Sequence, residues 1–192
     1  MRRHYEGHFR QTSVRLQTLE HLFLFDMNVF VINALVSFFA ALVLHELGHY
    51  FAARLCAVPI KQAGIGWGPK LYGVRVDSVD CQLRLLPIGA YVQMDMAALQ
   101  RRPLLQQLFV LGAGIGVNLV LCVLTWGSLF GALNLALAIG NLIPFYQLDG
   151  WKSGMVIVRR IFGRPSPVAE WSLTLGGGAI ALALLVRALL NI

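Results

Sequence analysis

The sequence His45-Glu46-Leu47-Gly48-His49 lies directly after an apolar stretch, residues 29–44, that carries no charged side chain. On a helix, His45 and His49 are one turn apart on the same face, so their imidazoles can bind the same zinc ion. Glu46 then lies beside that ion, where it can act as a general base toward water. The pattern therefore predicts a zinc site that carries a catalytic carboxylate.

The surroundings of this motif also favour a functional site. Two histidines and a carboxylate are costly at membrane depth, and such residues usually serve a function there. The alternative is that neighbouring helices satisfy these polar groups and that no metal is bound.

The composition is that of a membrane protein. Of the 192 residues, 57% are hydrophobic and 13% are charged, and the mean hydropathy is +0.67, which is too apolar for a soluble domain. The formal charge of +7 would suit nucleic acid, but the basic residues flank apolar stretches, as membrane orientation requires. We expect the lipid bilayer as a partner and no nucleic acid. Three cysteines lack CxxC spacing and predict neither disulfides nor a cysteine zinc site: Cys56, Cys81 and Cys122.

The apolar stretches predict an α-helical polytopic membrane protein with about four transmembrane helices. Residues 1–27 form a basic N-terminal arm that can fold as an interfacial helix, and residues 28–192 form one membrane domain. The expected spans cover about residues 29–56, 104–126, 129–148 and 172–190. The third of these spans belongs to a helix over 129–150 that carries the second motif described below.

The basic residues predict the orientation of the chain. If four helices cross in turn, eleven of the 16 Lys and Arg side chains, in segments 54–102 and 151–170, fall on one side. Such a bias marks the cytoplasmic side. We therefore expect a multi-pass protein of the cell membrane whose active site lies toward the cytoplasm.

The long loop over residues 57–98 has the pattern of a β-structure. Apolar and polar residues alternate from 72 to 85 on both sides of a turn at Asp77 and Ser78, which predicts a hairpin with one apolar face. Residues 60–65 and 90–94 can extend this sheet. We expect the sheet to be associated with the membrane, because its apolar face lies beside the predicted site.

A third zinc ligand has to come from another part of the chain. Among the five aspartates, only Asp149 ends an apolar helix, in the sequence Asn141-Leu142-Ile143-Pro144-Phe145-Tyr146-Gln147-Leu148-Asp149-Gly150. Pro144 breaks that helix and frees backbone groups around a polar pocket. The alternative is an ordinary helix end with a proline kink and an aspartate at the interface.

These two motifs resemble those of the site-2 protease family of intramembrane zinc metalloproteases, HExxH in one membrane helix and NxxPxxxLDG in a later one. The loop also resembles the family's: Gly66-Trp67-Gly68-Pro69 is similar to its GxG turn, and residues 86–92 are similar to its proline-glycine-tyrosine strand in a membrane-reentrant β-hairpin. Two positions depart from the family pattern, Ile115 in place of a proline and Ala90 in place of a glycine. Asn118, nearby, can bond across helices. We expect a compact member without a PDZ or CBS domain.

The resemblance implies one Zn²⁺ per chain, held by His45, His49 and Asp149, with Glu46 as the catalytic base. It also implies a substrate site formed by Asn141, Pro144, Gly66 and Gly68. The implied activity is regulated intramembrane proteolysis of single-span membrane proteins, with no gating partner identified. A helical substrate must be unwound locally, and an edge of the loop sheet can then pair with it as an added strand.

Two other classes of function use the same residues. In a membrane metal transporter or sensor, the histidines and Asp149 would bind an ion that passes through or is detected. In an inactive scaffold, the protease fold would only bind other proteins. The position of Glu46 beside His45 favours catalysis over transport, and the complete set of four residues argues against a scaffold.

Overall fold

The structure, a computed structural model, describes residues 2–163 and 166–190. Contacts within the chain define two units, Met1–Ser37 and Phe38–Ile192. The helix α1 (Arg2–Leu55) forms the described part of the first unit and continues into the second. The predicted arm over 1–27 is thus helical from Arg2, whereas the side chains of residues 1–24 lie outside the described part. Its interfacial position stays a prediction.

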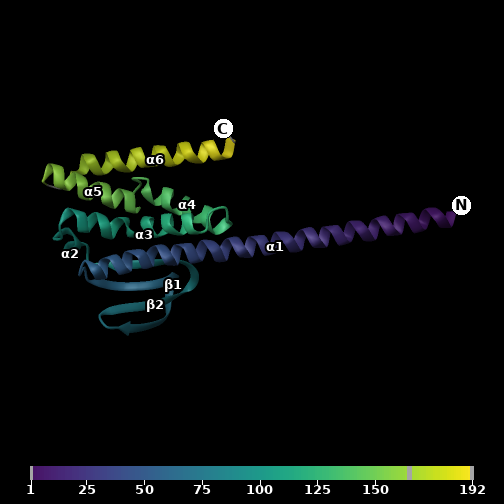
Figure 1. The fold of residues 1–192 in the computed structure, drawn as a ribbon, viewed down its shortest axis with the longest axis horizontal. Helices are drawn as coiled ribbons and strands as arrows, with labels where there is room; N and C mark the ends of the chain where they lie inside the picture. The colour runs from purple at the N-terminus through teal and green to yellow at the C-terminus, as the bar shows by residue number, and fades with distance from the viewer. Residues whose placement is uncertain (1, 164–165, 191–192) are drawn as a thin grey trace. The chain divides into compact units, whose positions relative to one another are not determined.

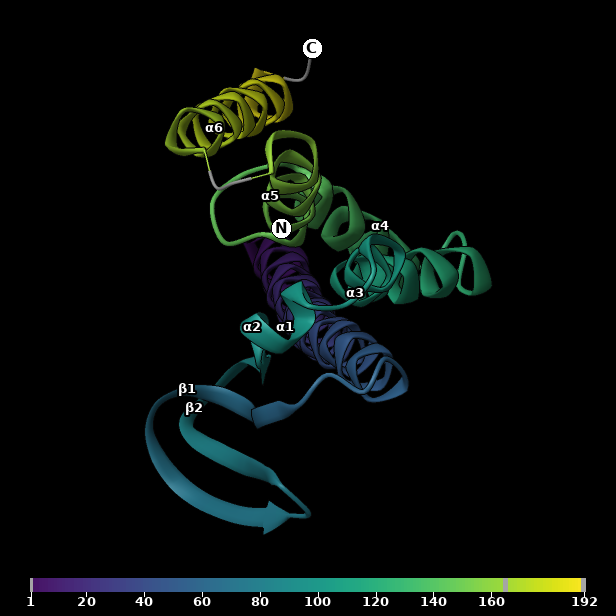
Figure 2. The same ribbon diagram turned by 90° about the vertical axis from the view of Figure 1, so that its left-hand side faces the viewer.

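The second unit combines a hairpin with a group of helices (Figures 1 and 2). Helix α3 packs against α4 and α5, and α5 packs against α6. In both views the hairpin and α6 lie on opposite sides of α3. The elements after α1 are β1 (Ile60–Val76), β2 (Val79–Met94), α2 (Met96–Gln100), α3 (Leu104–Leu124), α4 (Leu129–Leu142), α5 (Asp149–Phe162) and α6 (Pro167–Leu190).

Three described helices are long and apolar enough to cross a membrane: Phe25–Leu55, Leu104–Leu124 and Pro167–Leu190. They expose large apolar side chains, which suits contact with lipid. The apolar helix α4 has only 14 residues, which at about 1.5 Å per residue falls short of a hydrocarbon core about 30 Å thick. The number of four crossings, and the orientation that depends on it, therefore stay predictions.

The helix expected over residues 129–150 is shorter in the structure, and this expectation is corrected. Helix α4 ends at Leu142, Ile143 is extended with a ψ of 132°, and Asp149 is the first residue of α5. The reason is Pro144, which has no N–H to donate and disfavours helical geometry at the residue before it. The second motif is therefore a break between two helices, and Asp149 begins a helix where we had expected it to end one.

The predicted strands around Asp77 and Ser78 are present as the antiparallel pair β1 and β2. Each strand is long and bent, so that residues 72–76 pair with 79–83, and residues 60–65 pair with 90–94. Residues 62–65 also lie beside residues 80–83, which closes the bent hairpin into one small sheet. Residues 90–94 have partners on one side only, so they form an edge of this sheet.

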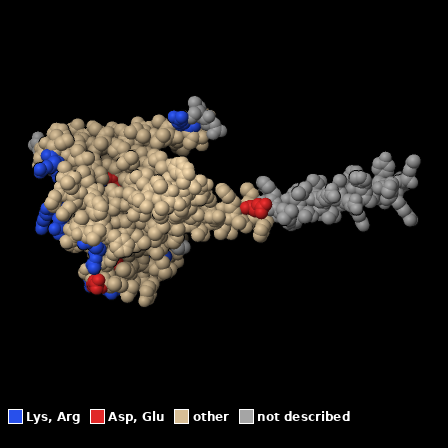
Figure 3. All heavy atoms as spheres, viewed as in Figure 1, with Lys and Arg blue, Asp and Glu red and all other residues tan. Residues whose placement is uncertain are grey.

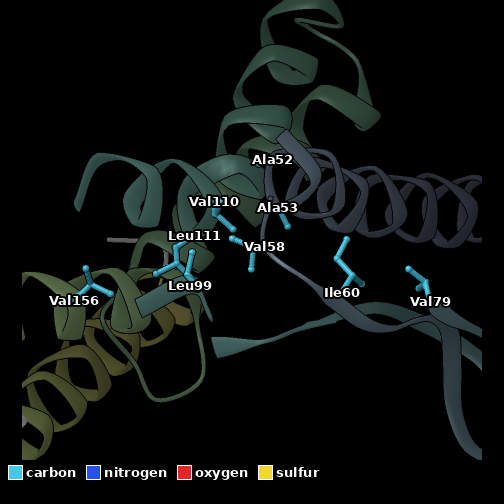
Figure 4. Close-up of a cluster of buried hydrophobic side chains, with 9 residues drawn as sticks. All are labelled: Ala52, Ala53, Val58, Ile60, Val79, Leu99, Val110, Leu111 and Val156. Carbon is cyan, nitrogen blue, oxygen red and sulfur yellow. The ribbon is translucent and has the colours of Figure 1, made fainter. Parts of the chain in front are cut away.

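A buried core connects the end of α1 to the hairpin, α2, α3 and α5 (Figure 4). Ala52 and Ala53 follow the histidine motif by one turn of α1, and they belong to the same buried cluster as Val110 and Leu111 of α3. Asp95 caps α2 by accepting hydrogen bonds from the N–H groups of Ala98 and Ala97, and the bond from Ala98 lowers the pKa of Asp95. The core therefore fixes the turn of α1 that carries the motif.

Helix α6 is packed against the break between α4 and α5. Gly177 is buried, and a Cβ atom there would collide with the backbone of Pro144 and Phe145. Trp151 of α5 adds a hydrogen bond of 3.2 Å from its Nε1 to the hydroxyl of Thr174. Helix α6 thus supports the segment that leads to Asp149.

We expect Gly177→Ala to lower the free energy of unfolding by about 1–3 kcal/mol, because an added methyl group cannot be accommodated beside rigid backbone. Gly176→Ala is the matched control, since a Cβ atom at Gly176 meets nothing within 4 Å. Thermal unfolding of the detergent-solubilised protein measures both. Equal melting temperatures for the two variants would contradict the packing of α6 described above.

Candidate metal centre

Three buried side chains from two distant helices converge at one point. His45 and His49 come from one face of α1, and Asp149 comes from the first residue of α5. The Oδ2 atom of Asp149 lies 3.1 Å from His45 Nε2 and 2.9 Å from His49 Nε2, and the two Nε2 atoms are 3.2 Å apart. These residues are the cluster of potential metal ligands found among the described residues. The structure thus brings together the three residues that the sequence analysis proposed as ligands.

The outer nitrogen of each imidazole is hydrogen-bonded to an oxygen. His49 Nδ1 lies 2.8 Å from the carbonyl oxygen of Val110, and His45 Nδ1 lies 2.5 Å from the side-chain oxygen of Asn118. A carbonyl oxygen can only accept, so each Nδ1 carries the proton and donates it. In the neutral imidazoles, both Nε2 atoms then present lone pairs toward Asp149.

This donor set fits a zinc ion. Two Nε2 lone pairs and a carboxylate oxygen form a group of three acceptors, which only a cation or additional protons can hold together. A tetrahedral zinc with bonds of about 2.0–2.1 Å has its ligand atoms about 3.3 Å apart. The observed separations of 2.9–3.2 Å are close to that value.

Gly114 of α3 leaves room beside these three atoms. A Cβ atom at Gly114 would lie 2.5 Å from His49 Nε2 and 2.6 Å from His45 Nε2, closer than real Cβ atoms approach other atoms. On α1, Gly48 lets α3 approach in the same way, since a Cβ atom there would lie 2.9 Å from the carbonyl oxygen of Ala113. The small residues of the two helices therefore form a cradle that a side chain would fill.

A chain of hydrogen bonds extends from His45 through two fully buried asparagines. Asn118 of α3 donates from Nδ2 to the side-chain oxygen of Asn134 at 2.7 Å, and Asn134 of α4 donates from Nδ2 to the carbonyl oxygen of Phe130 at 2.9 Å. The prediction that Asn118 bonds across helices is confirmed. The sequence analysis missed Asn134, although an asparagine in the middle of an apolar helix was the available signal.

Glu46 lines a cavity of about 270 Å³ next to the three ligand candidates. Its Oε2 atom accepts a hydrogen bond of 3.0 Å from the backbone N–H of Val92, which belongs to the edge of the sheet. His49, Asp149 and residues 91–94 line the same cavity. The catalytic candidate is therefore located between the metal centre and a strand edge.

Lys152 is a site residue that the sequence analysis used only for orientation. Its Nζ atom donates to Asp149 Oδ1 at 3.3 Å, and the residue also lines the cavity. Asp149 thus directs one carboxylate oxygen toward the two histidines and the other toward the ammonium group of Lys152. The signal in the sequence was the spacing of three residues, which places both side chains on one face of a helix.

The four predicted substrate-binding residues are not among the described residues that line this cavity. The amide of Asn141 donates to the carbonyl oxygen of Leu137 within α4, and Pro144 lies against Gly177. Gly66 and Gly68 have φ values of +95° and +89° and shape the bend of β1, and a Cβ atom at Gly66 would collide with the carbonyl oxygen of Leu86. In the structure these two glycines serve the geometry of the hairpin.

Comparison with known proteins shows which family the chain belongs to. The sequence model of peptidase family M50 matches residues 33–131, about half of the chain. The chain belongs to peptidase family M50. The family is that of the site-2 proteases, in agreement with the resemblance of the motifs, and together with the donor set it implies zinc as the cofactor.

Several relatives bear names that fit this assignment. A candidate zinc metalloprotease of Clostridium perfringens is 36% identical over 104 residues, which are 50% of this chain and 31% of the relative. One from Neisseria meningitidis is 30% identical over 159 residues, 74% of this chain and 34% of the relative. A candidate chloroplast membrane metalloprotease of Arabidopsis thaliana is 31% identical over 102 residues, 47% of this chain and 23% of the relative. The chain thus matches about a third or less of the length of these M50 relatives.

We expect Gly114→Ala to weaken zinc binding at least about tenfold, because the added methyl group would occupy space at both Nε2 atoms. Gly112→Ala and Gly116→Ala are matched controls on the same helix, since a Cβ atom at either position meets nothing within 4 Å. Competition with a chromophoric chelator measures the zinc affinity of each purified variant. Equal zinc affinity of all three variants would contradict the conclusion that the missing side chain of Gly114 leaves room for the ion.

Proposed function

We propose that this protein is a zinc metalloendopeptidase that hydrolyses peptide bonds in or near the transmembrane segments of other membrane proteins. The proposal depends on one observation above all: the two histidines of HExxH and the aspartate of the later motif meet at one buried point. The M50 family and the names of the relatives support the same chemistry.

His45, His49 and Asp149 would hold the zinc ion. When bound, zinc supplies a Lewis acid that polarises the scissile carbonyl group and makes water more acidic. Glu46 would accept the proton of the attacking water and then deliver it to the leaving amine. The N–H of Val92 and the cavity wall support this role, because they hold the carboxylate of Glu46 beside the site.

The edge of the sheet would bind the substrate in extended form. Residues 90–94 have strand partners on one side only, and residues 91–94 line the cavity that contains Glu46. A substrate strand added at this edge would bring its carbonyl groups into the cavity after local unwinding. Asn141, at the last turn of α4, would anchor the substrate backbone with the amide hydrogen that its bond to Leu137 leaves free.

The hydrogen-bond chain through Asn118 and Asn134 would position His45. The chain starts at the carbonyl oxygen of Phe130, which can only accept, so Asn134 must donate there and turn its oxygen toward Asn118. Asn118 then donates to Asn134 and turns its own oxygen toward His45 Nδ1. This polarity keeps the lone pair of His45 Nε2 toward the metal position.

The substrates we propose are single-span membrane proteins, cut in regulated intramembrane proteolysis at the cytoplasmic side. The site lies near one end of the apolar segment Phe25–Leu55, and a basic residue, Arg54, lies in the last turn of α1 at that end. Basic residues outnumber acidic ones in the segments that flank this end, as on the cytoplasmic side of membranes. The apolar face of the hairpin would lie at the bilayer boundary.

We expect Glu46→Gln to abolish cleavage of single-span substrates in membranes while zinc remains bound, because the amide keeps the shape of the side chain but cannot accept a proton. The loss should be at least about 10²-fold. The readout is a panel of substrates with and without helix-breaking residues near the cytoplasmic face, followed by zinc analysis of the purified variant. Undiminished cleavage would refute the proposal, and metal flux that persists in this variant would favour a transporter.

We expect Asn134→Leu to weaken zinc binding about tenfold, because Asn118 loses the acceptor that fixes its orientation. Asn134→Asp, in its protonated form, keeps an acceptor for Asn118 and a donor for the carbonyl oxygen of Phe130, and should recover most of the affinity. Thr125→Val is the control, since the hydroxyl of Thr125 donates to the carbonyl oxygen of Leu121 in α3 and lies outside the chain of asparagines. The same chelator competition measures the zinc affinity of all three variants. An unchanged affinity in Asn134→Leu would show that Asn134 does not help to position His45.

A further inference from the structure

A second polar cavity lies away from the metal centre, between the start of α3 and the last turns of α5. Its volume is about 370 Å³, and its polar lining comes from three arginines and two glutamines: Arg102, Arg159, Arg160, Gln100 and Gln107. Figure 3 shows that basic side chains gather at the end of the molecule where α3 begins and α5 ends. None of the described residues that line this cavity is acidic.

The arginines of this cavity lack anionic partners within the described residues. None of them forms an ion pair there, unlike Arg54, Lys61, Lys70 and Lys152. Arg102 donates to the carbonyl oxygen of Ala57, a neutral group. The Nε atom of Arg159 is buried and has no hydrogen-bond partner among the described residues. A buried charged donor without a partner is costly, which points to an anion as its ligand.

The start of α3 contributes to the same positive field. The helix begins at Leu104, which lines the cavity, and Pro103 before it provides no side-chain cap. The first N–H groups of a helix carry a partial positive charge and are common contacts for phosphate. Three arginines and the start of α3 thus line the same cavity.

We propose that this cavity binds the phosphate of an anionic phospholipid headgroup. The position favours a lipid over a soluble ligand, because α3 is a candidate span of 21 residues and the cavity is located where its apolar sequence begins. That point corresponds to the headgroup level of a bilayer, where basic pockets between helices bind anionic lipids. Orientation in the membrane accounts for basic residues at this end, but not for a cavity that they share or for the buried Nε atom.

A headgroup at this position would join two helices that also form the metal centre. Helix α3 carries Gly114 and Asn118, and α5 carries Asp149 at its other end. An anion that bridges the start of α3 and the end of α5 would hold the two helices together. The lipid would then stabilise the folded protein without touching the zinc ligands.

The test uses the full chain in detergent, with short-chain phosphatidylglycerol and phosphatidylcholine as probes and thermal unfolding as the readout. We expect phosphatidylglycerol to raise the melting temperature and phosphatidylcholine to have no effect. Arg160→Gln and Arg159→Gln should each weaken the binding of phosphatidylglycerol about tenfold. Arg75→Gln removes the same charge from the hairpin, outside the cavity, and should change the binding less than twofold.

Zinc content serves as the control for folding of each variant, and Arg160, which is exposed, is the substitution least disruptive to the fold. An equal loss of binding in Arg160→Gln and Arg75→Gln would overturn the proposal, because it would show general attraction to a basic surface. Inorganic phosphate is tested alone in the same assay. Stabilisation by phosphate at the same concentrations as phosphatidylglycerol would overturn the assignment to a lipid in favour of a soluble anion.

Discussion

The structure depends on the approach of three acceptor atoms to one another in a buried position. His45 Nε2, His49 Nε2 and Asp149 Oδ2 lie within 3.2 Å of each other, an arrangement that is unfavourable unless a cation is bound between them. The helices around these atoms must therefore hold them in this geometry and offset its unfavourable free energy. They do so with a close helix contact, with hydrogen bonds to the outer nitrogens, and with Lys152 on the second oxygen of Asp149.

The two histidines are oriented by different means, and the difference follows from their positions on α1. His49 lies beside the backbone of α3 and reaches the carbonyl oxygen of Val110 directly. His45 lies one turn earlier and needs a side chain, Asn118, whose amide could point either way. Asn134 removes that ambiguity because it is itself fixed by a backbone carbonyl group. The short helix α4 thus contributes to a site that it does not touch.

The sequence predicted His45 and His49 as zinc ligands because their spacing is local, and Asp149 because it is the one aspartate of the five that follows a long apolar stretch. One helical turn sets the relation of His45 to His49, and alternation of apolar residues sets the strands on both sides of Asp77. The predicted helix over residues 129–150 extends beyond the end of α4 at Leu142, because residues 144–150 were kept in the helix that Pro144 was expected to break. Asn134 and Lys152 were missed for another reason, namely that their roles depend on which helices pack together. A single sequence carries little information about which helices pack together.

The bond between Glu46 and Val92 connects the two parts of the proposed mechanism. The carboxylate that would accept a proton is held by an N–H group on the same strand edge along which a substrate would lie. A shift of residues 91–94 along the cavity would therefore either move the carboxylate of Glu46 or break its hydrogen bond to Val92. Because Gly66 at the bend of β1 fits closely against Leu86 of β2, the bend of the hairpin determines where this edge runs. The glycines of the loop would thus influence catalysis through the position of Glu46, even though they lie outside the cavity.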